Sequence, residues 1–200
     1  MLSWVTRVST MAAPSTDVEP MLDNVVLLNE AREPIGEVPR SEVHGRTTPL
    51  HLAFSVYVFD QTGNTLITRR SLTKASWPGV WTNTCCGHPR PDESIPTAIR
   101  RRLHDELCLD VGELECVLPD FAYRATDASG IEENEVCPVF AARALHPSAP
   151  LLPNPDEVLD WKWVRWLDVS EAARRTPFVF SPWAVLQMAE LGPRPWSPQH

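Results

Sequence analysis

The chain has 200 residues, which is enough for one domain to bury a sizeable core without disulfide or metal crosslinks. Eighteen basic and 26 acidic side chains give a net charge of −8 at pH 7. This charge excludes nucleic acid and an acidic membrane as partners, because both attract a basic surface, and it also counts against a phosphorylated ligand.

The cysteines and the apolar runs indicate a cytoplasmic location. Five cysteines, an odd number, do not fit the evenly paired disulfides of a small secreted scaffold. No apolar run approaches the roughly 20 residues of a membrane span. Residues 1–20 lack the apolar segment of a signal peptide. The sequence leaves open whether the chain is a monomer or a homodimer.

The first half of the chain predicts a tail followed by strands. Residues 1–20 are rich in Ser, Thr, Ala and Pro without periodicity, and we expect them to form a mobile tail. Apolar and β-branched runs predict strands at 24–29 and 48–59. The segment 60–64 (DQTGN) predicts a turn from which 65–70 pairs back as a hairpin.

The clearest helix spans 92–109. Asp92 or Ser94 can cap it, and Pro96 is acceptable in a first turn. Apolar side chains recur at helical spacing along one face, at Ile95, Ala98, Ile99, Leu103 and Leu107.

The second half predicts more strands and one further helix. The strands are expected at 114–118, 121–124, 132–142 and 159–166, and the proline-rich segment 147–155 is expected to be an extended loop. The last helix has Ser181 as its cap, Pro182 in its first turn, 183–191 as its body and Gly192 as its stop. We therefore predict a single α/β (α+β) domain over 21–192, with a mixed sheet flanked by helices and a loose tail at 193–200.

The segment 87–109 reads G-x5-E-x7-R-R-L-x-D-E-x-C-L. One interpretation is a solvated helix face held by the i,i+4 pairs Arg101–Asp105 and Arg102–Glu106. The spacing also resembles the Nudix box, G-x5-E-x7-R-E-U-x-E-E-x-G-U, where U is an apolar residue. Arg102 stands where the first catalytic Glu of that box belongs. The resemblance implies a Nudix-type fold, while the loss of that acid weakens the hypothesis of diphosphate hydrolysis.

Histidines and acids elsewhere could form a metal site. Glu133 and Glu135 share one face of a strand, and Cys86 and His88 share one face of an extended segment. With His44 and His51, these groups permit the mixed nitrogen and oxygen ligands that suit Zn²⁺ or Mn²⁺. The sequence alone does not show that they converge.

Longer motifs give a more specific resemblance. They are H-x6-H-L-A-F (44–54), T-R-R-x-L-x-K-x-x-W-P-G-V-W-T-N (68–83), C-G-H-P (86–89), Y-R-A-T-D-x-S-G-I-x-E-N-E-V-C-P-V-F (123–140) and F-S-P-W (180–183). In this order they resemble the type I isopentenyl-diphosphate Δ-isomerases over about 24–191. That family interconverts isopentenyl and dimethylallyl diphosphate in isoprenoid biosynthesis. It protonates an alkene and then removes a different proton from the tertiary carbocation.

The resemblance implies roles for individual residues. His44, His51, His88, Glu133 and Glu135 would hold one tightly bound divalent metal, Mn²⁺ or Zn²⁺. Glu135 would also exchange protons with the substrate carbon, and Cys86 would act from the opposite side, with Cys85 pointing away. Tyr123 would orient the acid by a hydrogen bond, and the π face of Trp183 would stabilise the cation.

The same resemblance implies how the diphosphate is held. Arg70 and Lys74 would bind it, with Arg69, Arg40 and Arg102 as weaker candidates. Glu106 would hold a Mg²⁺ that bridges to the diphosphate oxygens. Two divalent ions would cancel four of the negative charges locally, so the acidic balance no longer excludes a prenyl diphosphate.

Two other functions fit the sequence less well. A Nudix hydrolase is disfavoured by Arg102, and a catalytically silent metal-binding or interaction module is disfavoured by the intact set of Cys86, Glu135 and histidines.

Overall fold

The computed structural model describes residues 23–196. The tail predicted at 1–20 lies outside the described residues, as do positions 197–200 of the predicted C-terminal tail. The expected extended loop is present, because 145–157 contain no regular strand or helix. Among the described residues, no helix is both long enough and apolar enough to cross a bilayer.

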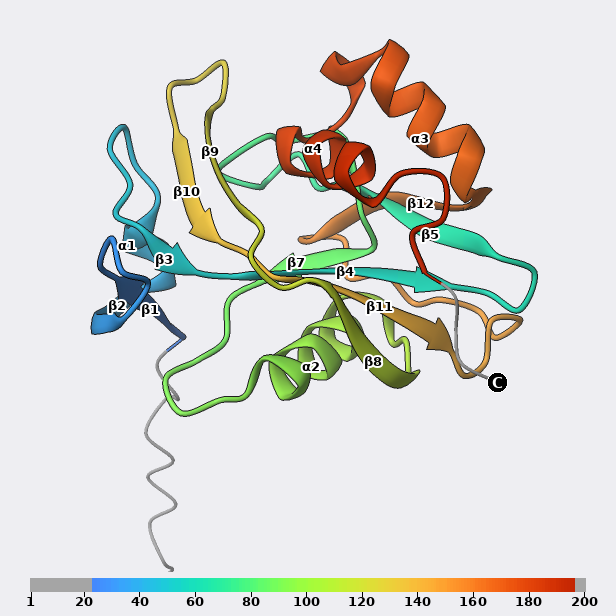
Figure 1. Cartoon of the computed structure of the whole chain (residues 1–200), viewed down its shortest axis with the longest axis horizontal. Coiled ribbons are helices and arrows are strands. Elements are labelled where there is room, and N and C mark those ends of the chain that lie inside the picture. The colour runs from blue at the N-terminus through green and yellow to red at the C-terminus, as the bar shows by residue number, and fades with distance from the viewer. Residues whose placement is uncertain (1–22, 197–200) are drawn as a thin grey trace, which may run out of the picture.

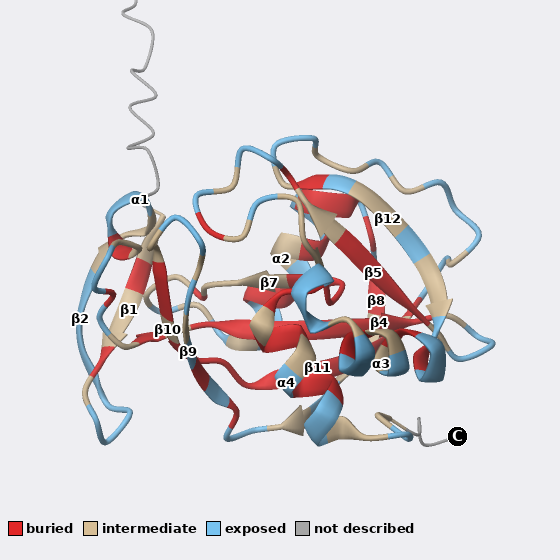
Figure 2. Ribbon diagram, turned by 90° about the horizontal axis from the view of Figure 1, so that it is seen from above, coloured by how far each residue is buried: buried red, intermediate tan, exposed pale blue. Residues whose placement is uncertain are grey.

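The strands form two mixed sheets that lie side by side (Figures 1 and 2). The first has the order β2-β1-β3-β10-β9, and the second has the order β12-β5-β4-β11-β8, with β6 added to β5 and β7 added to β4. Their bounds are β1 Asn24–Leu28, β2 Pro34–Pro39, β3 His51–Leu52, β4 Phe54–Phe59, β5 Asn64–Arg70, β6 Trp81–Thr82, β7 Cys85–Gly87, β8 Val111–Leu118, β9 Ala122–Thr126, β10 Glu132–Val136, β11 Val139–Ala144 and β12 Val158–Arg165.

Two long extended segments pass from one sheet into the other. Each was predicted as one continuous strand, and each is interrupted, the first at Ala53 and the second at Cys137–Pro138. Proline has no N–H to donate to a neighbouring strand, so a break at Pro138 is expected physically. The backbone bonds from Ala53 N to Val136 O and from Ser55 N to Pro138 O keep the two segments together across the interruptions.

The predicted hairpin forms, but its strands separate. Asp60 Oδ1 accepts from the backbone N–H groups of Thr62 and Asn64 at 2.8 Å each, which fixes the turn. Beyond the turn the segment 81–87 lies between β4 and β5, pairing with both through β7 and β6. Thr84 joins the two strands, since its hydroxyl accepts from Val58 N and donates to Leu66 O.

Helices cover both faces of the second sheet (Figure 1). Helix α2, Ile95–Leu107, begins at Ser94, whose hydroxyl accepts from Thr97 N, and its apolar face packs into a cluster with β4 and β11. On the other face lie α3, Trp166–Arg175, and α4, Pro182–Leu191, with the 3₁₀ helix η1, Pro177–Val179, between them in the chain.

Several elements were missed or misplaced by the sequence prediction. The strands β2, β6 and β7, the short helix α1 (Arg40–Val43), η1 and α3 were not predicted. The strand expected at 159–166 ends at Arg165, because Trp166 turns inward as the first residue of α3. The Ser181 hydroxyl makes no capping bond to α4 and instead hydrogen-bonds Thr82 Oγ1 at 2.8 Å.

The C-terminal part also contributes to the surface. Trp196, inside the predicted tail, lies against Phe59 with 5.6 Å between ring centroids.

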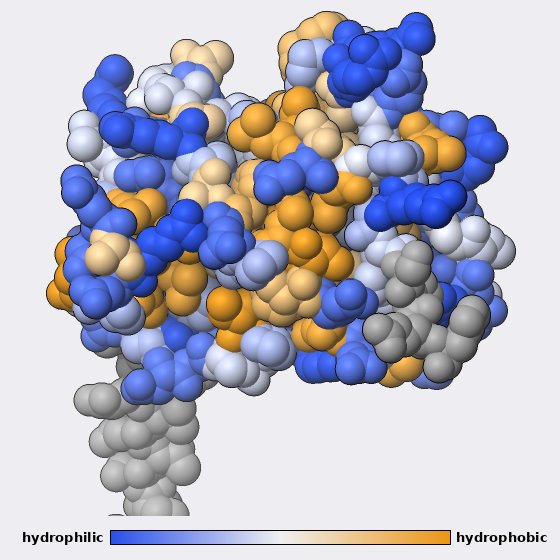
Figure 3. Space-filling model, in the orientation of Figure 1, coloured by the Kyte–Doolittle hydropathy of each residue, from blue (hydrophilic) through white to orange (hydrophobic). Residues whose placement is uncertain are grey.

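Figure 3 shows apolar side chains gathered in the middle of one face of the molecule. Phe178 on η1 and Leu186 on α4 are among the large apolar side chains that remain exposed.

Candidate active site

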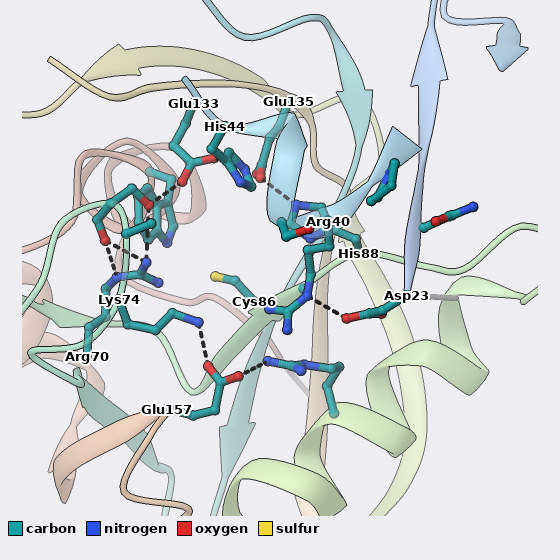
Figure 4. A pocket seen from close by; sticks show the side chains of 18 of the residues that line it. Asp23, Arg40, His44, Arg70, Lys74, Cys86, His88, Glu133, Glu135 and Glu157 are labelled. Carbon is teal, nitrogen blue, oxygen red and sulfur yellow. Dashed lines mark hydrogen bonds and ion pairs between the residues drawn. The ribbon is translucent and has the colours of Figure 1, made fainter. Parts of the chain in front are cut away.

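A cavity of about 570 Å³ lies where the first sheet, β7 and α2 meet. Its size is typical of small-molecule sites. Most of the residues singled out from the sequence line it: Arg40, His44, Arg70, Lys74, Cys86, His88, Arg102, Tyr123, Glu133, Glu135 and Trp183. Figure 4 shows the sulfur of Cys86 between the His/Glu group and the Lys74–Glu157 pair.

Three histidines and one glutamate form a compact cluster at this cavity, which His44, His88 and Glu135 line, whereas the fourth member, His51, is wholly buried beside them. One ligand atom from each of His44, His51, His88 and Glu135 lies within 4.8 Å of all the others. The imidazole centroids are 5.1 to 5.5 Å apart. The parallel pairing of β3 with β10 places Glu135 beside His51, which explains how residues so distant in sequence meet.

The cluster fits a divalent metal ion. Pro49 O accepts a hydrogen bond from His51 Nδ1 at 2.9 Å, which leaves the lone pair on Nε2 facing the cluster. The Nε2 atoms of His44 and His51 and Oε2 of Glu133 are buried and make no hydrogen bond, although His44 Nε2 and Glu133 Oε2 lie only 2.7 Å apart. Buried nitrogen and oxygen atoms of this kind are costly to leave unsatisfied, and an ion between them would satisfy them.

The acid–base properties of the cluster follow from its pairing. Burial alone would raise the pKa of Glu135, but its hydrogen bond with His88 Nε2 at 3.2 Å and the proximity of His51 Nε2 at 3.4 Å hold this pKa well below its usual range. Burial lowers the pKa of His88, and the neighbouring histidines add to this effect. The cluster therefore places an ionised carboxylate beside three imidazoles, a set of groups that could hold a cation together.

Glu133 lies at the edge of this cluster. Its Oε2 is 2.7 Å from His44 Nε2, and its Oε1 accepts from the Ser76 hydroxyl at 2.5 Å. Glu133 and Glu135 both line the cavity, as their alternation on β10 predicts. Glu132 faces away and pairs with Arg124 at 2.8 Å.

Cys86 faces the cavity from β7, and its neighbour does not. Ser55 Oγ lies 3.3 Å from the Cys86 sulfur, which donates to Asn83 Oδ1 at 3.0 Å. Burial raises the pKa of Cys86 to about 11, so the group is a thiol at neutral pH. The Cys85 sulfur donates to Glu106 on the other side of the strand, which confirms that Cys85 points away.

Aromatic side chains form the apolar wall. Trp183 is buried, and its ring lies 5.5 Å from Tyr123 and 5.6 Å from Trp77, centroid to centroid. The Arg70 guanidinium lies 5.2 Å from the Trp183 ring centroid and donates to the carbonyl of Ser76. Burial raises the pKa of Tyr123 well above its usual value, so its hydroxyl keeps its proton.

Tyr123 is paired with Glu135 across β9 and β10, so both side chains reach the cavity. Within residues 23–196, no hydrogen bond joins the Tyr123 hydroxyl to Glu135. The orienting bond expected from the sequence is therefore not formed in this structure.

Cations and acids alternate along the opposite wall. Lys74 pairs with Glu157 Oε2, and the Arg102 guanidinium lies 3.1 Å from Glu157 Oε1 and 2.6 Å from Glu106 Oε1. Glu157 was missed by the sequence analysis, because it directly follows a proline-rich loop and belongs to no recognised motif. Only the fold shows that it lies between two candidate diphosphate ligands.

Three predicted residues lie elsewhere than expected. Arg69 does not line the cavity, and its Nε donates to Gly79 O at 2.8 Å. Glu106 is buried behind Arg102, so the pair Arg102–Glu106 exists but is not solvated. Arg101 pairs with Glu93 at 2.7 Å and not with the predicted Asp105.

Arg40 lines the cavity with its Nε 2.5 Å from Asp23 Oδ2. The guanidinium thus reaches the cavity already paired with Asp23, which belongs to none of the motifs in the sequence.

We expect Glu157→Gln to destabilise the protein. Burial alone would raise the pKa of Glu157, but Lys74 and Arg102 lower it to about 2. Its stabilising effect is therefore present above about pH 4.5 and is lost as the pH falls toward 2. Full conversion of this shift gives roughly 3 kcal/mol, which we reduce to about 2 kcal/mol because water screens a partly exposed pair. Urea unfolding at pH 7 and pH 3 measures the effect.

Glu171→Gln is the matched control. Pairing with Arg174 and Arg175 lowers the pKa of Glu171 to about 2 as well, but this carboxylate is fully exposed. Water and salt screen such a pair, so its removal should change the unfolding free energy little. Equal losses for the two variants would contradict the assignment of a buried network around Glu157.

Residues 49–187 match the family model of the NUDIX domain. In fold, the chain is similar to the crystal structure of DR0079 from Deinococcus radiodurans, with a TM-score of 0.62 and 16% identity over 84% of this chain and 98% of that one. It is also similar to a MutT NUDIX hydrolase from Burkholderia pseudomallei, with a TM-score of 0.54 and 19% identity over 72% and 98% of the two chains.

Its sequence relatives are more specific. The chain is 54% identical to an isopentenyl-diphosphate Delta-isomerase of Frankia alni, over 90% of each chain. It is 53% identical to the protein of that name from Agromyces mediolanus, over 94% of this chain and 89% of the relative. A third such relative, from Cutibacterium acnes, is 54% identical over 86% and 88% of the two chains. The chain therefore belongs to the NUDIX family and, within it, to the isopentenyl-diphosphate Delta-isomerases.

Proposed function

We propose that this chain is the enzyme that interconverts isopentenyl diphosphate and dimethylallyl diphosphate in isoprenoid biosynthesis. The observation that carries the proposal is one cavity with the Glu135 cluster on one wall, the Cys86 thiol on another and Trp183 between aromatic neighbours. Identity of about half to relatives that bear the isomerase name supports the same function. The five cysteines are free thiols, which supports a cytoplasmic location.

The reaction needs one acid and one base on opposite sides of a three-carbon unit. A proton is added to the terminal CH₂ of the alkene, and the charge appears on the tertiary carbon. A different proton then leaves the neighbouring CH₂, so the proton count does not change. We assign these two proton transfers to Glu135 and Cys86. Each group must come within hydrogen-bond distance of the substrate carbon with which it exchanges a proton.

The pair starts with one transferable proton. Burial raises the pKa of Cys86 to about 11, while the Glu135 carboxylate is ionised because its pKa is held low by His51 and His88. An acid and a base are therefore present together near neutral pH. Since the reaction is reversible, each group gives up a proton in one direction and accepts it in the other.

We propose that His44, His51, His88 and Glu135, with Glu133 beside them, hold one tightly bound Mn²⁺ or Zn²⁺. When bound, this ion would fix the Glu135 carboxylate and tune its acidity. A Mg²⁺ carried by the diphosphate would be held on the side of Glu106, although this carboxylate does not line the cavity and pairs with Arg102.

The rest of the cavity would bind the substrate and protect the cation. Arg70, Lys74, Arg40 and Arg102 bring positive charge to one side for the diphosphate. Trp183 and Tyr123 present apolar rings where the hydrocarbon would lie. These walls would exclude water, which otherwise captures the cation as an alcohol.

Incubation with isopentenyl diphosphate, Mn²⁺ and Mg²⁺ in D₂O tests the function. Deuterated dimethylallyl diphosphate without phosphate release is the expected result, measured by NMR and a phosphate assay. Phosphate release without isomerisation would replace the proposal with hydrolysis.

Replacing Trp183 should separate its electrostatic role from its packing. We expect Trp183→Phe to keep part of kcat and Trp183→Leu to lose about tenfold more, because a cation over a desolvated ring is stabilised by about 2 kcal/mol. Steady-state kinetics with a thermal unfolding check would measure this. Equal rates for the two variants would show that the ring only fills space.

A further inference from the structure

Asn83 lies between the residues to which we assign proton transfer and cation stabilisation. It is fully buried in the segment that separates β4 from β5. Its Oδ1 lies 3.0 Å from the Cys86 sulfur, 3.1 Å from Trp183 Nε1 and 2.8 Å from Thr82 Oγ1. One oxygen atom thus contacts both reactive walls of the cavity.

The orientation of the Asn83 amide is fixed by its other end. Its Nδ2 donates to Val56 O at 3.2 Å and to Cys85 O at 2.7 Å. A flipped amide would oppose its oxygen to two carbonyl oxygens and its NH₂ to three donors. Only one orientation satisfies all five contacts, so the acceptor always faces Cys86 and Trp183.

The same position joins two parts of the fold. Cys86 lies on β7, whereas Trp183 lies in the first turn of α4, 97 positions later in the chain. Thr82, which donates to Asn83, also hydrogen-bonds Ser181 at the start of α4. The backbone bond from Ser181 N to Trp81 O, 2.8 Å long, adds a second connection.

We propose that Asn83 is a positioning residue that sets the thiol of Cys86 and the indole of Trp183 relative to each other. This inference rests on the proposed function. Proton transfer requires the sulfur near the substrate carbon, and stabilisation of the cation requires the ring face directed at the neighbouring carbon. One shared acceptor couples these requirements. Without it, the Trp183 indole N–H loses its acceptor and the Cys86 thiol keeps only Ser55, so each group can rotate separately.

The test compares Asn83→Ala with Thr84→Val in the full chain with Mn²⁺ and Mg²⁺. Thr84 is the adjacent buried residue, and Thr84→Val removes two hydrogen bonds between β4 and β5 without touching Cys86 or Trp183. We expect Asn83→Ala to lower kcat about 100-fold, since misplacement by about 1 Å costs that much, with KM changed less than about threefold. Thr84→Val should keep kcat within about threefold at a similar loss of stability.

A loss of kcat no larger than that of Thr84→Val, or a loss seen mainly in KM, would overturn the inference. If Asn83→Ala does not fold, hydrogen exchange of the indole N–H in the unaltered chain tests the inference instead. The Trp183 indole N–H should exchange with D₂O as slowly as that of Trp166, which donates to Gly192 O at 2.8 Å. Much faster exchange would show that Asn83 does not hold the ring.

The two hypotheses fail in different ways. If the unaltered chain does not isomerise isopentenyl diphosphate, the proposed function is wrong. If the unaltered chain isomerises it and Asn83→Ala behaves like Thr84→Val, only the role of Asn83 is wrong.

Discussion

Cys86→Ala and Glu135→Gln are each expected to lower kcat by a factor of about 10² to 10⁴ or more while the protein stays folded. Each substitution removes one of the two groups proposed to exchange protons with the substrate, and among residues 23–196 no second cysteine lines the cavity. The measurement is the rate of isomerisation, with deuterium incorporation from D₂O to detect half-reactions.

Cys137→Ala is the matched control for the cysteine. Its sulfur lies 3.4 Å from Ser55 Oγ, the same hydroxyl that lies 3.3 Å from the Cys86 sulfur, but Cys137 does not line the cavity. Glu132→Gln is the matched control for Glu135→Gln, because Glu132 is on the same strand and pairs with Arg124. Near-normal turnover in Cys86→Ala or Glu135→Gln would refute the assigned role of that residue.

Removal of the divalent ion by a chelator should abolish turnover and lower the melting temperature. The proposed ligands come from segments far apart in the chain, so the ion would bind the folded state and not the unfolded one. At a free ion concentration of about 1,000 times Kd, this contributes about 4 kcal/mol to stability. For a chain of this length the shift in Tm is roughly 10 °C. Scanning calorimetry and metal analysis before and after chelation measure it.

Two histidine variants distinguish the loss of ion binding from a general loss of stability. His51→Gln should abolish tight binding and the Tm shift, because His51 is wholly buried with its Nε2 facing the cluster. His104→Gln should change neither, since His104 is exposed on α2 and lies 3.9 Å from Asp110. Binding should weaken below about pH 6, where free imidazoles become protonated. An unchanged Tm after complete chelation would argue against the site.

The sequence predicted those parts of the fold in which local pattern and tertiary packing agree. Helix α2 has an apolar stripe, a serine cap and a proline in its first turn, and the structure contains it. Helix α3 was missed because its first residue, Trp166, continues the alternation of β12. Strands β6 and β7 are two and three residues long and exist only because β4 and β5 separate. No local signal encodes such a gap.

The site shows the same division. His44, His88, Glu133, Glu135 and Cys86 were identified from motifs, and the structure brings them into one cavity. Glu157 and Asn83 were not identified as site residues, because their importance depends on what the fold places next to them. Glu106 was identified by its spacing, but the helical pattern does not show that its carboxylate is buried behind Arg102. Contacts between distant segments are therefore what sequence reasoning missed.

The pairing of β3 with β10 has a consequence for how the chain reaches its native state. Glu135 stands opposite His51 in this short parallel ladder, and a slip by one position would present Asn134 or Val136 instead. Because side chains alternate between faces, such a slip would also turn the acid away from the imidazoles. An ion bound there would thus stabilise chains with the correct strand register over slipped ones during refolding. It would select the native register before any substrate is present.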